Sequence, residues 1–149
     1  MYLTRHTDYA LRVLMYAGAR QGRRVTITEV AEVYDISRNH LVKVVNTLGR
    51  LGYLQTSRGK GGGIRLGLPP EEIGVGRVVR HMEEQLEIID CAGSECPILG
   101  PCRLSGVLDE ALEAFLAVLD RYTLAYLLGN QDQILHALGV PDPEVPSEA

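Results

Sequence analysis

The apolar residues in the first third of the chain recur at the spacing of helices. Residues 4–20 and 38–50 each repeat apolar side chains every three or four positions, so each stretch is predicted to be a helix. Between them, residues 28–34 form a shorter helical stretch that Thr28 can cap. We predict a short strand at 25–27, just ahead of this stretch.

Only a tight turn, residues 35–37, separates the last two of these helices. Its final residue, Ser37, can cap the helix that follows. Two short helices joined by such a turn make up a helix-turn-helix. The pattern therefore predicts that residues 38–50 form the recognition helix of this motif.

Two short strands follow the predicted recognition helix. They cover residues 53–57 and 64–66, and the glycine-rich, basic sequence 58–63 lies between them. A basic hairpin in this place is typical of the wing of a winged helix, which lies along the DNA backbone or in the minor groove. A phosphate loop for nucleotides is excluded, because the spacing Gly-x-x-x-x-Gly-Lys-Ser/Thr and its strand-to-helix context are absent.

The second half of the chain is predicted to hold two further helices. After a linker at Pro69 and Pro70, residues 73–84 carry one apolar side. Ser105 can cap a long helix that could continue to Leu128, with apolar residues every three or four positions. An acidic helix with such a heptad-like seam is best explained as a dimerisation arm; the alternative is a helix folded back on its own domain.

Length and composition restrict the class of protein. The 149 residues suit one compact domain, or a small domain with an appended helical arm. The chain has no apolar run long enough to span a membrane and no apolar signal core near its N-terminus, so we predict a soluble, cytoplasmic protein without a membrane partner.

The formal net charge of −4 conceals an asymmetry along the chain. Residues 1–80 hold 13 Lys and Arg against 6 Asp and Glu, whereas residues 81–149 hold 2 against 13. A basic half and an acidic half indicate two different partners.

The basic residues of the first half lie where DNA would be contacted. Arg38, Asn39 and His40 begin the predicted recognition helix, where side chains reach base edges, Arg toward guanine and Asn toward adenine. An ordinary amphipathic helix with a solvated face would not explain the basic wing that follows. We expect the remaining basic residues of these elements mainly to hold phosphates: Lys43, Arg58, Lys60 and Arg65.

All three cysteines, Cys91, Cys96 and Cys102, lie in one short segment. Glycines and prolines between them predict a loop, in which three sulfurs can meet at one point. The odd count argues against a disulfide framework, and packing cysteines would lie among apolar neighbours at helix or strand spacing. Metal or cluster ligation is favoured, with zinc and iron–sulfur both open. A fourth ligand must come from an Asp, Glu or His, or from a small molecule.

Nothing in the sequence indicates an enzyme. No nucleophile with its base and no paired catalytic carboxylates are recognisable, and the four histidines are dispersed. A small electron carrier would leave the basic winged half without a purpose.

Four stretches of this sequence resemble one group of regulators. They are residues 3–12, residues 37–43, the wing at 58–67 and the three-cysteine loop. The stretches resemble the NsrR-type nitric-oxide-sensing repressors, in the winged-helix regulator family that also includes IscR. The resemblance covers nearly the whole chain, to about residue 138. The IscR branch usually has a His three residues after the last cysteine, where this chain has Ser105.

The resemblance implies a DNA-binding transcriptional repressor whose operator affinity is controlled by a 4Fe-4S cluster that reacts with nitric oxide. It implies a homodimer on a pseudo-palindromic operator in double-stranded DNA. It also implies that Cys91, Cys96 and Cys102 hold the cluster together with Asp8 of the partner subunit. The residues alone would make Asp8 a surface charge beside Arg12. The alternative is a regulator of the same fold that senses iron–sulfur supply or redox state with a 2Fe-2S cluster.

Together these inferences predict a mainly α-helical fold, a winged helix-turn-helix DNA-binding domain with a two-stranded wing and a long C-terminal dimerisation helix. The predicted domains are 1–80 for DNA binding, 81–104 for a cluster-binding loop region, 105–138 for the dimerisation helix and a C-terminal helical segment, and 139–149 for a disordered tail.

Overall fold

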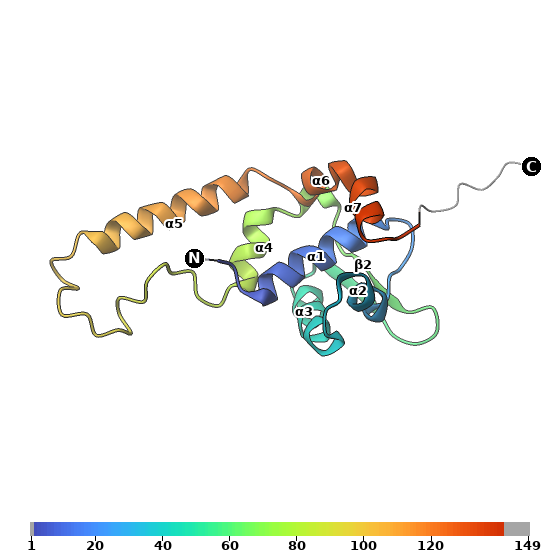
Figure 1. Cartoon of the computed structure of the whole chain (residues 1–149), viewed down its shortest axis with the longest axis horizontal. Coiled ribbons are helices and arrows are strands. Elements are labelled where there is room, and N and C mark those ends of the chain that lie inside the picture. The colour runs from blue at the N-terminus through green and yellow to red at the C-terminus, as the bar shows by residue number, and fades with distance from the viewer. Residues whose placement is uncertain (1, 142–149) are drawn as a thin grey trace, which may run out of the picture.

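The structure is a computed structural model that describes residues 2–141 (Figure 1). The elements in chain order are α1 (Arg5–Ala19), α2 (Ile27–Tyr34), α3 (Arg38–Arg50), β1 (Leu54–Ser57), β2 (Gly63–Leu66), the 3-10 helix η1 (Pro70–Glu72), α4 (Val75–Met82), α5 (Leu104–Asp120), α6 (Leu124–Leu127), the 3-10 helix η2 (Leu128–Asn130) and α7 (Gln131–Ala137). The chain is mainly helical with a two-stranded antiparallel sheet, which confirms the predicted fold class. The predicted disordered tail lies, from residue 142 onward, outside the described residues.

Helix α1 lies at the centre of the fold, with α3 on one side and the C-terminal helices on the other (Figure 1). Its cap is Thr4, whose hydroxyl accepts a hydrogen bond from the Thr7 N–H at 3.3 Å. Val13, Leu14 and Tyr16 are fully buried. Each element of residues 1–80 is therefore positioned, directly or through a neighbour, by its packing on α1.

The helix-turn-helix forms as predicted, and α3 has the predicted bounds. The predicted start of α2 was wrong, because Thr26 rather than Thr28 caps it: the Thr26 hydroxyl accepts from the Glu29 N–H at 3.0 Å. Helix α2 therefore begins at Ile27, and the predicted strand at 25–27 is reduced to a single bridge. Ser37 occupies the cap position of α3 without a side-chain hydrogen bond.

The wing is an antiparallel hairpin in which Leu54 pairs with Leu66 and Ser57 with Gly63. Val25 extends it, since its N–H donates to the Ile64 carbonyl at 2.9 Å and its carbonyl accepts from the Ile64 N–H at 2.7 Å. Gly63 adopts a φ of 143°, and a Cβ there would lie 2.5 Å from the Val25 carbonyl oxygen. Only glycine fits this crossing of two backbones.

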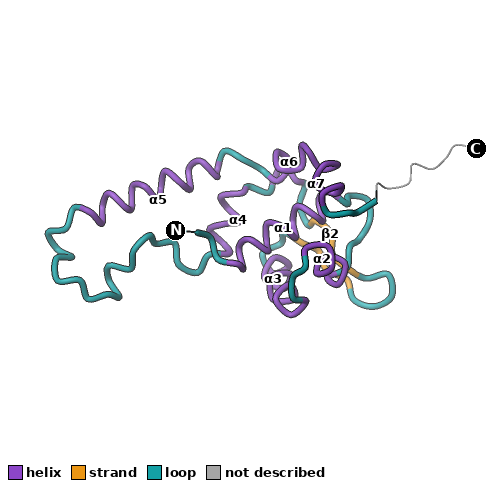
Figure 2. The backbone as a smooth tube through the Cα atoms, in the orientation of Figure 1, coloured by secondary structure: helices purple, strands orange, loops and turns teal. Residues whose placement is uncertain are grey.

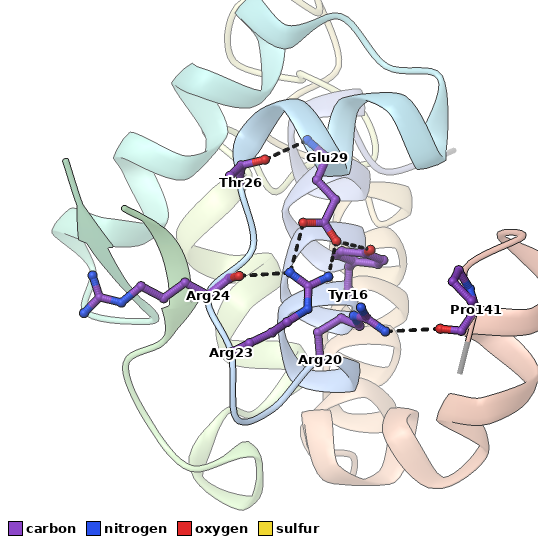
Figure 3. A network of polar contacts seen from close by, with 7 residues as sticks. All are labelled: Tyr16, Arg20, Arg23, Arg24, Thr26, Glu29 and Pro141. Atoms are coloured by element: carbon purple, nitrogen blue, oxygen red, sulfur yellow. Dashed lines mark hydrogen bonds and ion pairs between the residues drawn. The ribbon is translucent and has the colours of Figure 1, made fainter. Parts of the chain in front are cut away.

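A polar network fixes the start of α2 against the end of α1 (Figure 3). The buried Tyr16 hydroxyl donates to the Glu29 carboxylate at 2.6 Å, and Arg23 forms an ion pair with the same carboxylate. Burial, together with the hydrogen bond to Glu29, raises the pKa of Tyr16 to about 12. Partial burial works against ionisation of Glu29, but the hydrogen bonds from Arg23 and Tyr16 outweigh it and lower the pKa of this carboxyl.

The long C-terminal helix is shorter than predicted. Helix α5 ends at Asp120 and not near Leu128, because the chain turns back there: the Leu124 N–H donates to the Ile73 carbonyl at 2.8 Å, and Thr123 caps α6. Burial of three leucines against α1 favours this turn over a helix that continues into solvent. These leucines are Leu124, Leu128 and Leu135.

The start of α5 also differs from the prediction. Ser105 lies inside the helix, and its hydroxyl donates to the Cys102 carbonyl at 3.3 Å, while Arg103 occupies the cap position. Between α4 and α5, residues 83–103 form a long loop that extends away from the rest of the chain (Figure 2).

Helix α5 packs on α4 near its C-terminal end and leaves much apolar surface exposed. Asp120 forms a two-pronged ion pair with Arg80, one N–O distance being 2.8 Å. Leu116 is the buried residue of α5, whereas Leu104 and Val107 are 57% and 59% exposed. These exposed apolar residues of α5 are compatible with the predicted dimerisation arm. The dimer itself stays a prediction, and so does the division into domains.

None of the described helices combines the length and apolarity needed to cross a membrane. The predicted cytoplasmic location stays a prediction.

The contact between α4 and α5 depends on Gly76. A Cβ at this position would lie 2.9 Å from Asp120 Cγ and 3.0 Å from its backbone nitrogen. We expect Gly76→Ala to lower the free energy of unfolding by about 1–2 kcal/mol, because overpacking exceeds the gain in helix propensity. Urea denaturation measures the change. Gly106→Ala, also in a helix but with open space around the added methyl, is the control and should be neutral or stabilising.

The lowered pKa of Glu29 predicts a pH-dependent stability. Its contribution is present above the ordinary pKa of 4.5 and is lost as pH falls through the lowered value in the folded state. We expect Glu29→Gln to cost about 1–2 kcal/mol at neutral pH. The difference from wild type should disappear in acid. Urea titrations at several pH values measure it, with exposed Glu32→Gln on the same helix as control; a pH-independent difference would contradict the prediction.

Candidate nucleic-acid interface and metal centre

The residues predicted to read bases lie on the exposed face of α3. Arg38, Asn39 and His40 are exposed, while the opposite apolar stripe of the helix is buried. Arg38 Nε donates to the Thr28 hydroxyl at 3.3 Å, which holds this guanidinium against α2. The His40 ring lies 6.1 Å from that of Tyr9, centroid to centroid. The first turn of α3 is thus available to a ligand and partly ordered by its neighbours.

The basic residues predicted to hold phosphates are also exposed. They are Lys43 on α3, Arg58 and Lys60 at the tip of the wing, and Arg65 on β2. Arg65 Nε donates across the hairpin to Gln55 Oε1 at 2.9 Å, so its guanidinium is held along the sheet.

Two residues next to this surface were missed from the sequence. Arg5 and His6, at the start of α1, line a cavity of about 220 Å³ together with Tyr9, His40 and Lys43. Arg5 stands in the first turn of its helix, where the helix dipole disfavours a cation. That unfavourable placement is the signal that could have drawn attention to the N-terminus of α1.

The three cysteines lie on the long loop between α4 and α5, as predicted. Cys91, Cys96 and Cys102 are partly exposed thiols without a disulfide. Local turns shape the loop: the Leu99 N–H donates to the Cys96 carbonyl at 3.2 Å, and the Cys102 N–H donates to the Ile98 carbonyl at 3.0 Å. The thiols are thus held by short-range turns rather than by a helix or strand.

The electrostatics of the loop suit a cation. Desolvation raises the pKa of the Cys91 thiol, and nearby negative charges raise it further; these belong to Cys96, Cys102, Asp109 and Asp90. A positively charged metal centre would offset the repulsion among thiolates. The donor types therefore fit a soft metal or an iron–sulfur cluster.

The described residues of one chain do not gather these donors into a finished site. Among residues 2–141, no three His, Cys, Asp or Glu side chains lie close enough to share a metal ion. Asp8 forms an ion pair with Arg12 at 2.9 Å, and Arg12 also lies over the Tyr34 ring at 5.7 Å. Within one chain, Asp8 is therefore the surface charge that its spacing from Arg12 suggests.

A carboxylate at the base of the cysteine loop joins the loop to α1. Glu83 follows the last residue of α4, and its Oε1 accepts hydrogen bonds from the Thr4 N–H at 2.8 Å and the Thr4 hydroxyl at 3.0 Å. On the same helix, His81 Nδ1 lies 2.8 Å from the Tyr53 hydroxyl, next to the wing. No sequence pattern indicates the Glu83 contact, since its partner is far away along the chain.

The Rrf2 family, described as iron-dependent transcriptional regulators, matches residues 3–130. The chain belongs to this family. It is 50% identical over 142 residues to the HTH-type transcriptional regulator NsrR of Bacillus subtilis, covering 93% of this chain and 97% of that one. It is 51% identical over 135 residues to NsrR of Geobacillus kaustophilus, covering 88% and 92%. The resemblance to NsrR-named regulators is confirmed, and a family of transcriptional regulators agrees with the prediction that the chain is not an enzyme.

Solved structures share the fold. CymR of B. subtilis, described as a global cysteine regulator, has a TM-score of 0.69 at 23% identity and covers 85% of this chain and 95% of its own. An IscR from T. potens has a TM-score of 0.70 at 22% identity, with 90% of each chain covered. At these identities the likeness concerns the fold alone.

Proposed function

We propose that this chain is a transcriptional repressor that binds a pseudo-palindromic operator as a homodimer, with an affinity controlled by a 4Fe-4S cluster that reacts with nitric oxide. The observation that carries the proposal is the joining of a three-thiol loop, through Glu83, to the helix on which the recognition helix packs. The NsrR-named relatives, similar along nearly the whole chain, support it.

Different parts of the DNA-binding surface would contact bases and phosphates. Arg38, Asn39 and His40 would read base edges in the major groove from the first turn of α3. Phosphate contacts would come from Lys43, Arg58, Lys60 and Arg65, which fix the register of the protein on the duplex.

Dimerisation through α5 would set the spacing of two such surfaces. The exposed apolar residues of this helix, among them Leu104 and Val107, would be buried against a second copy. Two recognition helices related by a twofold axis require half-sites one or more helical turns apart, and hence a pseudo-palindromic operator.

Cys91, Cys96 and Cys102 would hold the cluster, together with Asp8 of the partner subunit. When bound, the cluster supplies iron that reacts with nitric oxide. To serve as a ligand, Asp8 must leave its ion pair with Arg12, an exposed pair that is inexpensive to break. A carboxylate binds such iron less tightly than a thiolate, so the Asp8 contact is the one most easily lost.

The cysteine loop would act on α3 through α1. Glu83 holds the start of α1 through Thr4, and this end of α1 lines a cavity with His40 and Lys43 of α3. A change in the loop that pulls Glu83 away would release Thr4 and let the start of α1 move relative to α3. Only one arrangement of the dimer fits both half-sites, so operator affinity would follow the state of the loop.

Native mass spectrometry with absorption spectroscopy on anaerobically purified protein tests the proposal. We expect a dimer with one 4Fe-4S cluster per subunit, and loss of both the cluster spectrum and operator binding when nitric oxide is added.

Asp8→Ala should weaken cluster retention and the nitric oxide response. Arg12→Gln breaks the same ion pair but keeps the carboxylate, so it should retain both.

Other results would contradict the proposal that the chain senses nitric oxide. Zinc in place of iron, or a 2Fe-2S cluster indifferent to nitric oxide, would leave a DNA-binding regulator with a different signal. An Asp8→Ala variant with unchanged cluster binding and response would exclude ligation by the partner's carboxylate.

The Glu83 link gives a separate prediction. Glu83→Gln weakens the acceptor for the two Thr4 hydrogen bonds without touching a thiol. We expect normal cluster content but a smaller ratio between the operator affinities of the cluster-bound and cluster-free forms, measured by fluorescence anisotropy. Glu84→Gln, an exposed neighbour, should leave the ratio unchanged. An unaltered ratio in Glu83→Gln would remove this carboxylate from the coupling.

A further inference from the structure

A hollow separates the second half of α3 from the first strand of the wing. It has a volume of about 740 Å³ and is lined by Lys43, Val45, Asn46, Thr47, Gly49, Arg50, Thr56 and Arg58. We call this hollow the α3–wing trough. It lies beyond the base-reading residues of the first turn, and four of its polar residues have no role in the function proposed above: Asn46, Thr47, Arg50 and Thr56.

The DNA-facing side of α3 does not stop at Lys43. Asn39, Lys43, Asn46 and Arg50 follow one another at intervals of four, three and four residues, which places them on one face of the helix. All four are exposed. This face therefore carries polar or cationic side chains from the first turn of α3 to its last.

The trough is suited to a polyanion by its charge. Lys43, Arg50 and Arg58 are cationic, and none of its lining residues in the described part of the chain is acidic. The Thr47 hydroxyl donates to the Lys43 carbonyl at 3.1 Å and accepts from Arg50 Nη2 at 3.5 Å. This contact engages one of the five N–H donors of Arg50, so the other donors of this lining residue can bind a phosphate.

The shape of duplex DNA explains why such a trough would be needed. A line of phosphates separates the major groove from the minor groove on each strand. A protein that inserts a helix into one groove and a wing into the next must straddle that line, and the space between helix and wing is where the phosphates pass.

We propose that the α3–wing trough holds the phosphodiester backbone of one DNA strand, with Arg50 and Thr56 as additional phosphate ligands. The proposal rests on the proposed DNA-binding function and extends it to the second half of α3. It assigns no base recognition to Arg50, because a contact to phosphate carries no sequence information.

Gly49 forms part of the lining of the trough and offers a second means of testing it. A Cβ at this position would lie 3.7 Å from Thr56 Cγ2, an ordinary van der Waals contact. Alanine is therefore tolerated by the fold, while a longer side chain would project into the space assigned to the phosphates.

Arg50→Gln in the full, anaerobically purified chain is the first test. The probes are a duplex selected by the wild type from a randomised pool and a scrambled duplex, each titrated over a salt series. We expect the slope of log affinity against log salt to fall by about one unit on both duplexes, with the preference between them unchanged. Arg121→Gln removes the same charge from the exposed link between α5 and α6 and should leave the slope unchanged.

Two variants at Gly49 and one at Thr56 complete the experiment. We expect Gly49→Ala to bind like wild type, Gly49→Glu to bind both duplexes more weakly, and Thr56→Val to lose affinity equally on both. Circular dichroism melting shows that each variant is folded. Unchanged binding in Arg50→Gln and Gly49→Glu, or a loss confined to the selected duplex, would overturn the trough while DNA binding stands. A wild type that binds neither duplex would overturn the proposed function as well.

Discussion

The burial of α1 is the constraint on which the rest of this structure depends. Val13, Leu14 and Tyr16 are fully enclosed, and the elements that enclose them come from both ends of the chain. Since a packed interior resists gradual deformation, a displacement of α1 is passed to its neighbours rather than absorbed. The same hydrophobic packing that stabilises the fold therefore provides a rigid connection between α3 and α4, the helix from which the cysteine loop starts.

The two ends of α1 are held by polar contacts of different kinds. At the C-terminal end, Tyr16 is buried and its hydroxyl shares the Glu29 carboxylate with Arg23 (Figure 3). At the N-terminal end, Glu83 holds Thr4 through hydrogen bonds that are exposed to water. Exposed contacts open at lower free energy than buried ones, so the N-terminal end is the part of α1 that is released more easily.

Basic charge and exposed apolar surface lie on different elements of the molecule. Base-edge and phosphate contacts are assigned to α3 and the wing, where basic residues are exposed, whereas α5 is acidic and exposes apolar residues such as Leu104 and Val107. Arg80 and Asp120 join the two halves by an ion pair, and Gly76 lets their helices approach closely. An acidic helix kept away from the DNA-facing side avoids repelling phosphates, while its apolar seam suits a protein partner.

The sequence by itself determined what depends on neighbouring residues. The bounds of α3, the hairpin of the wing and the loop that carries the cysteines followed from periodicity, glycines and prolines, all of which act within a few residues. The pairing of Asp8 with Arg12 is equally local. Only the tertiary structure decided where α5 ends, because the Leu124 N–H finds its acceptor in Ile73, far back along the chain. The Glu83 contact with Thr4 also joins distant segments, and no local pattern encodes which distant residues will meet.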